Sequence, residues 1–232
     1  MQLLAARIAP ILESDDMLLV LGGNCTVALA VMAGLRRLEA GTPGLLYLDR
    51  QYDLNTPHST TDGALDWMGM AHALALPGVV DELADAFGAR PLAEAFQVCW
   101  LGVQDESATA WERDQAARLK IRCKSSADFV SDPIASVETL LDALPAGPLA
   151  VHFDVDVLDF TDCPLAENTD GRNSGPTLDT ATEALIRAAG DARFRALSVG
   201  EVNPTRSAGD PEVLPRFCDA LARVLASPAH SE

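Results

Sequence analysis

Five short apolar runs alternate with longer segments of helical periodicity along this 232-residue chain. The runs are nearly continuous in Val, Leu, Ile and Phe, which is typical of strands covered on both faces by other elements. Strands that alternate with helices form a parallel sheet with helices packed on both of its faces. We therefore predict a three-layer α/β/α fold with a central, mainly parallel sheet. The five predicted strands are Met17–Leu21, Leu45–Asp49, Phe96–Gly102, Leu149–Asp154 and Ala196–Glu201.

The segments between these runs predict helices, and the opening residues MQLLAARIAPILESDD form a further amphipathic pattern. Asp132-Pro133 and Asp210-Pro211 each place a capping residue before a proline, which predicts a helix start. In contrast, Asp159–Thr177 has no periodicity and is rich in turn-forming residues. A loop of that length inside a compact domain is usually functional. The predicted helices are Cys25–Leu38, Trp67–Leu76, Ala110–Leu119, Ile134–Leu144, Thr180–Ala189 and Glu212–Leu225.

Charge and cysteine content exclude several classes of protein. Thirty-four acidic and seventeen basic residues give a net charge of −17, which opposes binding to nucleic acid or to an anionic membrane surface. No apolar run approaches the length of a membrane span, and no signal peptide is recognisable. The five cysteines are odd in number and form no CxxC pair, which argues against a disulfide framework or a zinc ribbon. We expect one domain over residues 1–232 in a cytoplasmic protein.

Acidic residues gather where three of the predicted strands end. Ligands of open parallel sheets bind beyond the carboxyl ends of the strands, and alternate residues of an extended strand point the same way. Carboxylates that converge on one pocket repel one another unless a cation lies among them. One such Asp is more often a cap or turn residue, but two alternating acidic patterns favour a metal site. The acids are Asp49 and Asp53, Asp154 and Asp156, and Glu201.

Four segments resemble the arginase/agmatinase (ureohydrolase) family, in that family's order, between Met17 and about Leu225. Gly22-Gly-Asn-Cys25 resembles the family's Gly-Gly-Asp-His. Asp49-Arg-Gln-Tyr-Asp-Leu-Asn-Thr-Pro57 is similar to Asp-Ala-His-x-Asp-x-Asn-Thr-Pro. His152-Phe-Asp-Val-Asp-Val-Leu-Asp159 resembles Ser-x-Asp-x-Asp-x-x-Asp-Pro, and Glu201-Val-Asn-Pro204 matches Glu-Val-Asn-Pro.

The resemblance implies a site for two manganese ions, held by four aspartates and two histidines, with a hydroxide that attacks a guanidinium carbon. It implies that Asp49 and Asp154 bridge both ions, while Asp53 binds the first ion and Asp156 the second. It also implies that Glu201 pairs with the guanidinium of a small substrate, and that the chain forms homo-oligomers, trimers or hexamers. The remaining implied positions are Asn55, Asp62 and Ser107 for substrate contacts and Asp66 in place of the proton-relay histidine.

This chain departs from the family pattern at both histidine ligands. Cys25 and Gln51 take these two places. A thiolate prefers softer metals than manganese, so Fe, Co, Ni or Zn are candidates beside Mn, as one ion or two. The cysteine resembles the branch that hydrolyses N-hydroxyarginine, whereas the amide oxygen of Gln51 is a neutral, weak ligand. Ser107 replaces a carboxylate expected to meet the substrate's α-ammonium, which weighs against arginine itself.

Three histidines near these segments have less direct interpretations. His58 and His72 could replace the relay histidine but fit loop and helix-face positions better, and His152 fits a core or outer-shell position. The family's opening strand has no counterpart before Met17, so the N-terminal helix or a partner would have to cover a sheet edge.

The leading prediction is metal-dependent hydrolysis of a linear C–N bond in a guanidino or amidino compound. One alternative is a pseudoenzyme that kept the fold and serves as a binding or oligomer-scaffold protein. A deacetylase-like hydrolase with a single metal is less favoured, because its His-His relay pair is absent.

Overall fold

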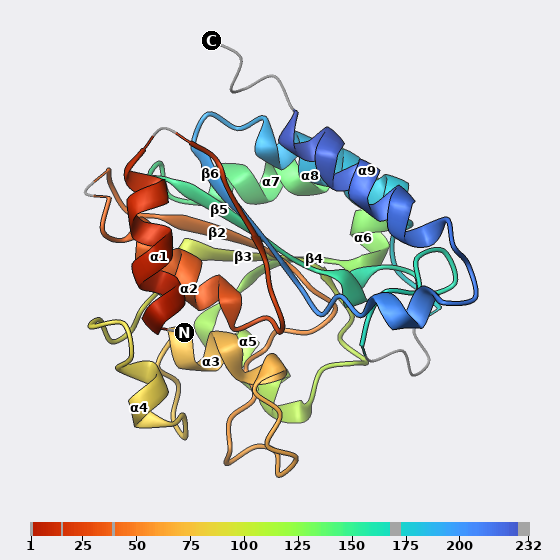
Figure 1. Ribbon diagram of the computed structural model, residues 1–232. Coiled ribbons are helices and arrows are strands. Elements are labelled where there is room, and N and C mark those ends of the chain that lie inside the picture. The colour runs from red at the N-terminus through yellow and green to blue at the C-terminus, as the bar shows by residue number, and fades with distance from the viewer. Residues whose placement is uncertain (1, 15, 39, 168–172, 227–232) are drawn as a thin grey trace.

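A six-stranded parallel sheet forms the centre of the computed structural model, which describes residues 2–14, 16–38, 40–167 and 173–226. Its strand order is β1-β6-β5-β2-β3-β4, and every neighbouring pair is parallel. The predicted three-layer α/β/α fold with a parallel sheet is therefore confirmed (Figure 1). The strands are β1 (Leu18–Leu21), β2 (Gly44–Leu48), β3 (Val98–Val103), β4 (Arg122–Ser125), β5 (Leu149–Asp154) and β6 (Phe194–Gly200).

Each face of the sheet has its own apolar core, because successive side chains of a strand point to opposite faces. In β2, Leu46 and Leu48 belong to one core and Leu45 and Tyr47 to the other. Helices α1 (Gln2–Glu13), α2 (Val27–Leu35), α3 (Gly69–Ala73) and α5 (Ala110–Leu119) contribute to the Tyr47 core. Helices α6 (Ser126–Ser131), α7 (Pro133–Ala143), α8 (Leu178–Ala189) and α9 (Val213–Leu225) contribute to the Leu46 core, and α4 (Asp81–Ala84) packs beside α3.

One buried strand and one helix match the sequence prediction best. The bounds of β5 and α5 are those predicted, and the other four predicted strands are each found with ends that differ by at most two residues. Strand β4 was not predicted, since it lies at the sheet edge and its polar residues are alternately half-buried and exposed. The short helices α4 and α6 were not predicted either.

The two predicted aspartate caps have different outcomes. Asp132 caps α7, because its carboxylate accepts the N–H of Ala135 at 2.9 Å. The prediction for Asp210 was wrong. Helix α9 begins at Val213, and the Asp210 carboxylate accepts the N–H of Glu212 at 3.0 Å. Asp210 therefore closes a turn that precedes the helix.

Helix α1 lies next to the β1 edge of the sheet. Gly34 of α2 lets α1 approach closely, since a Cβ at this position would meet Ile8 and Leu12 side-chain atoms at 2.8 and 2.9 Å. Arg195 of β6 donates to the carbonyl oxygens of Leu12 and Ser14 at 2.7 and 2.6 Å. These contacts fasten α1 to α2 and its end to β6.

No helix in the described ranges is long and apolar enough to cross a bilayer. The longest, α9, has 13 residues, whereas a transmembrane helix needs roughly 20 apolar ones.

Beyond the carboxyl ends of several strands the chain forms loops and short 3₁₀ turns. Short 3₁₀ turns follow β5 and β6, at Val155–Val157 and Pro204–Ser207, and another lies at Asp66–Met68. The predicted loop at 159–177 carries no helix in its described part, although Ala166 forms an isolated bridge with Val202. Residues 168–172 of this prediction lie outside the described residues. Thr177 ends the loop, where its hydroxyl accepts the N–H of Thr180 and caps α8.

Candidate functional site

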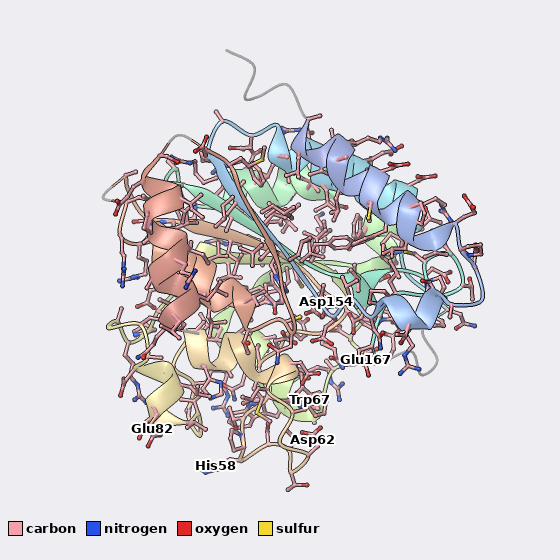
Figure 2. The ribbon with its side chains drawn as sticks, in the orientation of Figure 1. His58, Asp62, Trp67, Glu82, Asp154 and Glu167 are labelled. Carbon is pink, nitrogen blue, oxygen red and sulfur yellow. The ribbon has the colours of Figure 1, made fainter. Side chains whose placement is uncertain are left out.

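A pocket of about 180 Å³ opens where the loops after β2, β5 and β6 meet. The segment that carries Asp62 and Trp67 also lines the pocket. Figure 2 shows these two residues below the end of β5, where Asp154 lies. Most of the polar lining is acidic, as the resemblance implied. The described lining residues are Gln51, Asp53, Asp62, Ala64, Asp66, Trp67, Asp154, Asp156 and Glu201.

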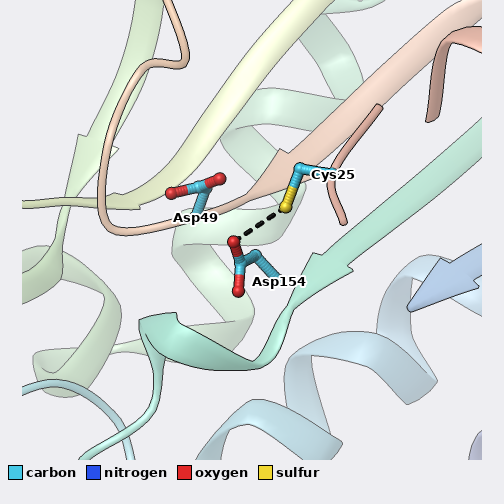
Figure 3. A group of neighbouring side chains, drawn as sticks. All are labelled: Cys25, Asp49 and Asp154. Atoms are coloured by element: carbon cyan, nitrogen blue, oxygen red, sulfur yellow. Dashed lines mark hydrogen bonds between the residues drawn. The ribbon is translucent and has the colours of Figure 1, made fainter. Parts of the chain in front are cut away.

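Cys25, Asp49 and Asp154 form a buried cluster, with a possible ligand atom from each residue within 4.8 Å of the others (Figure 3). Their exposed fractions are 1%, 1% and 4%. The Cys25 thiol donates to Asp154 Oδ2 at 2.8 Å. Two carboxyl groups and a thiol enclosed together form a donor set that could hold a divalent ion once the thiol proton is displaced. The cluster therefore fits a metal ion, and its sulfur favours a soft one.

The turn after β1 brings Cys25 to the two aspartates. Gly22 donates its N–H to the carbonyl of Val199 at 3.0 Å, and the Gly23 carbonyl accepts the N–H of Glu201 at 2.8 Å. A Cβ at Gly22 would lie 2.5 Å from a Val27 methyl carbon, so glycine permits the close approach of α2. The end of β1 is thus tied to the end of β6, and Cys25 faces β5 across this junction.

Each of the two bridging candidates is oriented by its own loop. Asp49 Oδ1 accepts the N–H of Gln51 at 2.7 Å, and Asp154 Oδ1 accepts the N–H of Asp156 at 2.8 Å. Both are local turns in which an aspartate bonds to the backbone two residues later. In both aspartates this turn holds Oδ1, and in Asp154 it leaves Oδ2 to accept from the Cys25 thiol.

Burial changes the protonation chemistry of the cluster. It raises the pKa of the Cys25 thiol well above its usual value, and the carboxylates of Asp154, Asp53 and Asp49 raise that pKa further. Burial also raises the pKa of Asp53, although a 2.5 Å hydrogen bond from the Tyr47 hydroxyl acts in the opposite direction. Without a cation, the cysteine is a neutral thiol, in agreement with its donation to Asp154.

Asp53 and Glu201 both have left-handed backbone conformations, with φ of 55° and 61°. Such angles are unfavourable for side chains other than glycine, although Asp tolerates them better than most. Glu201 is fixed on both sides, because its N–H donates to Gly23 and its carbonyl accepts the N–H of Glu167 at 3.1 Å. The two strained residues both line the pocket.

The structure places seven of the eleven predicted site residues in the pocket lining and Cys25 and Asp49 in the cluster with Asp154. Asn55 and Ser107 are not among the lining residues. Asn55 is fully buried, and its side-chain oxygen Oδ1 accepts from the hydroxyls of Ser59 and Thr109 at 3.1 and 2.9 Å. The Ser107 carbonyl accepts from Gln51 Nε2 at 3.4 Å, so Ser107 supports a lining residue through its backbone.

The three histidines within the described ranges are not among the lining residues. His72 uses both ring nitrogens, toward the Met68 carbonyl at 2.8 Å and the Val80 N–H at 3.1 Å, and so supports the segment after α3. His58 packs against Gly78. His152 is fully buried, and burial lowers its pKa to about 3, which leaves the ring neutral.

Sequence reasoning missed the buried guanidinium of Arg50. Its Nε donates to the Asp156 carbonyl at 3.1 Å, and its other nitrogens reach Ser174 O at 2.8 Å and Gln104 Oε1 at 3.3 Å. Arg50 is only 3% exposed and joins the loop after β2 to the loop after β5. An arginine is rarely buried, so its position in the sequence carried no signal of this role.

The class of protein is defined by a parallel α/β/α sheet with a pocket lined by carboxylates at the carboxyl ends of its strands. The model of the Arginase family matches residues 1–215, so the chain belongs to that family. Human arginase-1 is 25% identical over 228 residues, which cover 96% of this chain and 69% of the human protein. The N(omega)-hydroxy-L-arginine amidinohydrolase of Streptomyces lavendulae is 29% identical over 148 residues, covering 64% of this chain and 48% of that enzyme.

Solved structures show the same fold. The arginase of Bacillus caldovelox superposes with a TM-score of 0.84 at 21% identity, covering 97% of this chain and 73% of that one. The formimidoylglutamase of Bacillus subtilis gives a TM-score of 0.75 at 17% identity, covering 98% of this chain and 66% of that one.

Proposed function

We propose that this chain is a metal-dependent hydrolase that cleaves a linear C–N bond in a small guanidino or amidino compound. The observation that carries the proposal is the buried cluster of Cys25, Asp49 and Asp154 below a pocket lined by further carboxylates. Family membership supports the same chemistry, since the named relatives include arginases and an amidinohydrolase.

The cluster and the lining acids divide into ligands for one or two ions. With two ions, Asp49 and Asp154 are proposed to bind both. Cys25 and Asp53 are then proposed to bind the first ion, and Asp156 the second. Gln51 donates its Nε2 to Ser107, so its Oε1 is the atom proposed to face the second ion. A divalent ion held there would act as a Lewis acid that activates water. Manganese is the family precedent, and the sulfur makes Fe, Co, Ni or Zn further candidates.

Substrate charge is proposed to be recognised by Glu201. A planar guanidinium donates two parallel hydrogen bonds to a carboxylate, and this pairing is strongest where water is excluded. Glu201 lines the pocket, and its backbone is fixed by Gly23 and Glu167. Asp62 is proposed as a further substrate contact; its Oδ1 already accepts from the Ala64 N–H at 3.0 Å and the Trp67 indole at 3.3 Å.

Hydrolysis forms a bond from water oxygen to the guanidinium carbon and breaks one C–N bond, so the departing nitrogen must gain a proton. Asp66 is proposed to deliver that proton, since it lines the pocket in place of the family's histidine. A positioned carboxyl group is one of the side chains that can act as a general acid.

The test loads the purified chain separately with Mn, Fe, Co, Ni and Zn and measures metal content by mass spectrometry. Each form is then offered arginine, N-hydroxyarginine, agmatine and guanidinobutyrate in a calorimetric binding screen and an assay for released amine. We expect bound metal and hydrolysis of at least one compound. Metal binding without any guanidino ligand would overturn the proposal and favour the binding or oligomer-scaffold alternative, whose assembly is measured by ultracentrifugation.

A further inference from the structure

His152 has a buried ring nitrogen, Nε2, close to the end of the Cys25, Asp49 and Asp154 cluster that borders Gly200. Its ring stacks on Tyr47, with centroids 4.7 Å apart and planes inclined by 26°. Nδ1 lies 2.9 Å from the Ser198 hydroxyl on β6. Nε2 is fully enclosed and has no hydrogen-bond partner among the described residues. A buried polar atom without a partner is costly, so its retention indicates a partner that is acquired in another state of the protein.

This nitrogen and the sulfur of Cys25 both border the space beside Gly200. A Cβ built at Gly200 would lie 3.2 Å from Cys25 Sγ, 3.2 Å from His152 Cε1 and 3.4 Å from His152 Nε2. Strand register explains this meeting, because Ser198 pairs with His152 and Gly200 pairs with Asp154. The sulfur and the imidazole edge therefore share the space above the bare Cα of Gly200.

Ser198 favours a proton on Nε2. Its hydroxyl has two possible acceptors, His152 Nδ1 at 2.9 Å and the Val151 carbonyl at 3.5 Å. The second distance is too long for a good O–H···O bond. Donation to Nδ1 leaves the only ring proton of a neutral imidazole on Nε2. The ring then offers an N–H donor to the Cys25 side.

We propose that His152 donates its Nε2–H to the Cys25 sulfur when a metal ion is bound, and thereby holds that sulfur as a thiolate ligand. A metal-bound cysteine carries no proton, so its present donation to Asp154 is lost and the enclosed thiolate needs a donor. His152 is thus a positioning residue for Cys25, of the kind that commonly orients metal ligands from outside. This inference rests on the proposed metal site, and it makes that site selective for a thiophilic ion such as Co²⁺ or Zn²⁺.

The test is the absorption spectrum of the full chain loaded with Co²⁺, whose near-ultraviolet sulfur-to-cobalt charge-transfer band reports on the thiolate. His152→Phe keeps an aromatic ring against Tyr47 but removes the N–H donor. Ser198→Ala removes the hydroxyl that sets the proton on Nε2. His72→Phe exchanges another buried histidine outside the cluster and is the matched control, while Cys25→Ser identifies the sulfur. Thermal unfolding checks that every variant is folded.

We expect the band in the wild type, its loss in Cys25→Ser, and a shift to longer wavelength in His152→Phe, because a hydrogen bond stabilises the sulfur electrons. Cobalt affinity should fall by about 10-fold or more in His152→Phe, the usual effect of removing such a partner. Ser198→Ala should give a smaller shift in the same direction, and His72→Phe none. If His152→Phe does not fold, Ser198→Ala decides.

The possible failures are distinguishable. An unchanged band in His152→Phe and Ser198→Ala would overturn this inference and leave the metal site and the proposed hydrolysis standing. Bound cobalt without any charge-transfer band would overturn it as well, since Cys25 would not be a ligand, while the aspartates could still support hydrolysis. Failure of the wild type to bind cobalt or any other ion would overturn both proposals.

Discussion

Arginine side chains complete the amino end of the sheet, whereas acidic side chains crowd its carboxyl end. At the amino end, Arg193 donates to the carbonyls of Leu141, Leu144 and Pro145 and pairs with Asp191 at 2.8 Å. Carbonyl oxygens left at the ends of α7 and its following loop are thereby satisfied. The charge of the Arg193 guanidinium is thus balanced within the chain.

At the carboxyl end, buried carboxyl groups and a thiol lie against one another around Asp154. Among the arginines in the described ranges, only Arg50 is buried. Its guanidinium donates hydrogen bonds to backbone carbonyl oxygens and to the amide oxygen of Gln104. The two ends thus differ in what completes them. The amino end is stabilised by the chain itself, whereas the carboxyl end gathers acidic groups whose mutual repulsion the proposed cation would offset.

The largest expected effect that tests this contrast comes from Asp154→Asn. Metal that binds only the folded wild type at about 1,000 times its Kd should stabilise it by about 4 kcal/mol, and the variant should lose this gain. Without metal, the variant should be as stable as the wild type or more so, because like-charge repulsion is relieved. Thermal unfolding with and without Co²⁺ or Mn²⁺ measures both effects. Asp114→Asn, at an exposed ion pair, is the control, and equal metal stabilisation in Asp154→Asn would contradict the bridging role.

Glu201→Gln should separate substrate binding from metal binding. We expect unchanged metal content and a loss of about 2–3 kcal/mol in binding of a guanidino ligand, the cost of removing one partner of an enclosed charge pair. Calorimetry on wild type and variant with the same metal loaded makes the comparison. Equal affinity would show that Glu201 serves only the loop beside Asn203.

The double variant Cys25→His, Gln51→His should raise manganese affinity by about 10-fold, because imidazole supplies a directed nitrogen donor that manganese accepts better than a thiolate or an amide. Manganese content after dialysis, measured by mass spectrometry, gives the result. Equal content in variant and wild type would indicate that these side chains do not face the ions. Cys163→Ser, a buried cysteine elsewhere in the fold, is the control for loss of a thiol.

The smallest effect belongs to the amino end. Hydrogen bonds from Arg193 lower the pKa of Asp191, so this aspartate binds protons less readily when folded than when unfolded. Its contribution to stability is present above the ordinary aspartate pKa and is lost as pH falls through the lowered one. Asp191→Asn should cost about 1 kcal/mol at pH 7, because the pair is partly screened by solvent, and less near pH 3. Urea unfolding at both pH values tests this; a constant difference would contradict the linkage.

Prediction from the sequence succeeded where one physical pattern dominates. Strand β5 is apolar throughout because both of its faces are covered, so its bounds could be read from the run itself. Strand β4 has no such pattern, since an edge strand pairs through its backbone and tolerates polar side chains such as Arg122 and Lys124. Asp210 resembled a helix cap because a proline follows it, but its carboxylate is used in the preceding turn.

The candidate site was predictable as a set of acids at strand ends but not as a three-dimensional arrangement. Spacing along the chain holds no information on the 2.8 Å contact between Cys25 and Asp154, which are 129 positions apart. Asn55 looked like a pocket residue, yet hydrogen bonds from Ser59 and Thr109 hold it in the interior. The direction of His152 depends on the absence of a side chain at Gly200, a neighbour on another strand.

The left-handed backbone at Asp53 and Glu201 has a consequence for laboratory evolution. A non-glycine residue in this conformation costs roughly 1–2 kcal/mol, and proteins accumulate changes that recover such losses when nothing selects against them. Libraries of this chain selected only for heat resistance should therefore enrich glycine or asparagine at these two positions. Libraries selected for turnover of a guanidino compound should retain both acids at the same positions, so the two selections would separate the demands of folding from those of catalysis.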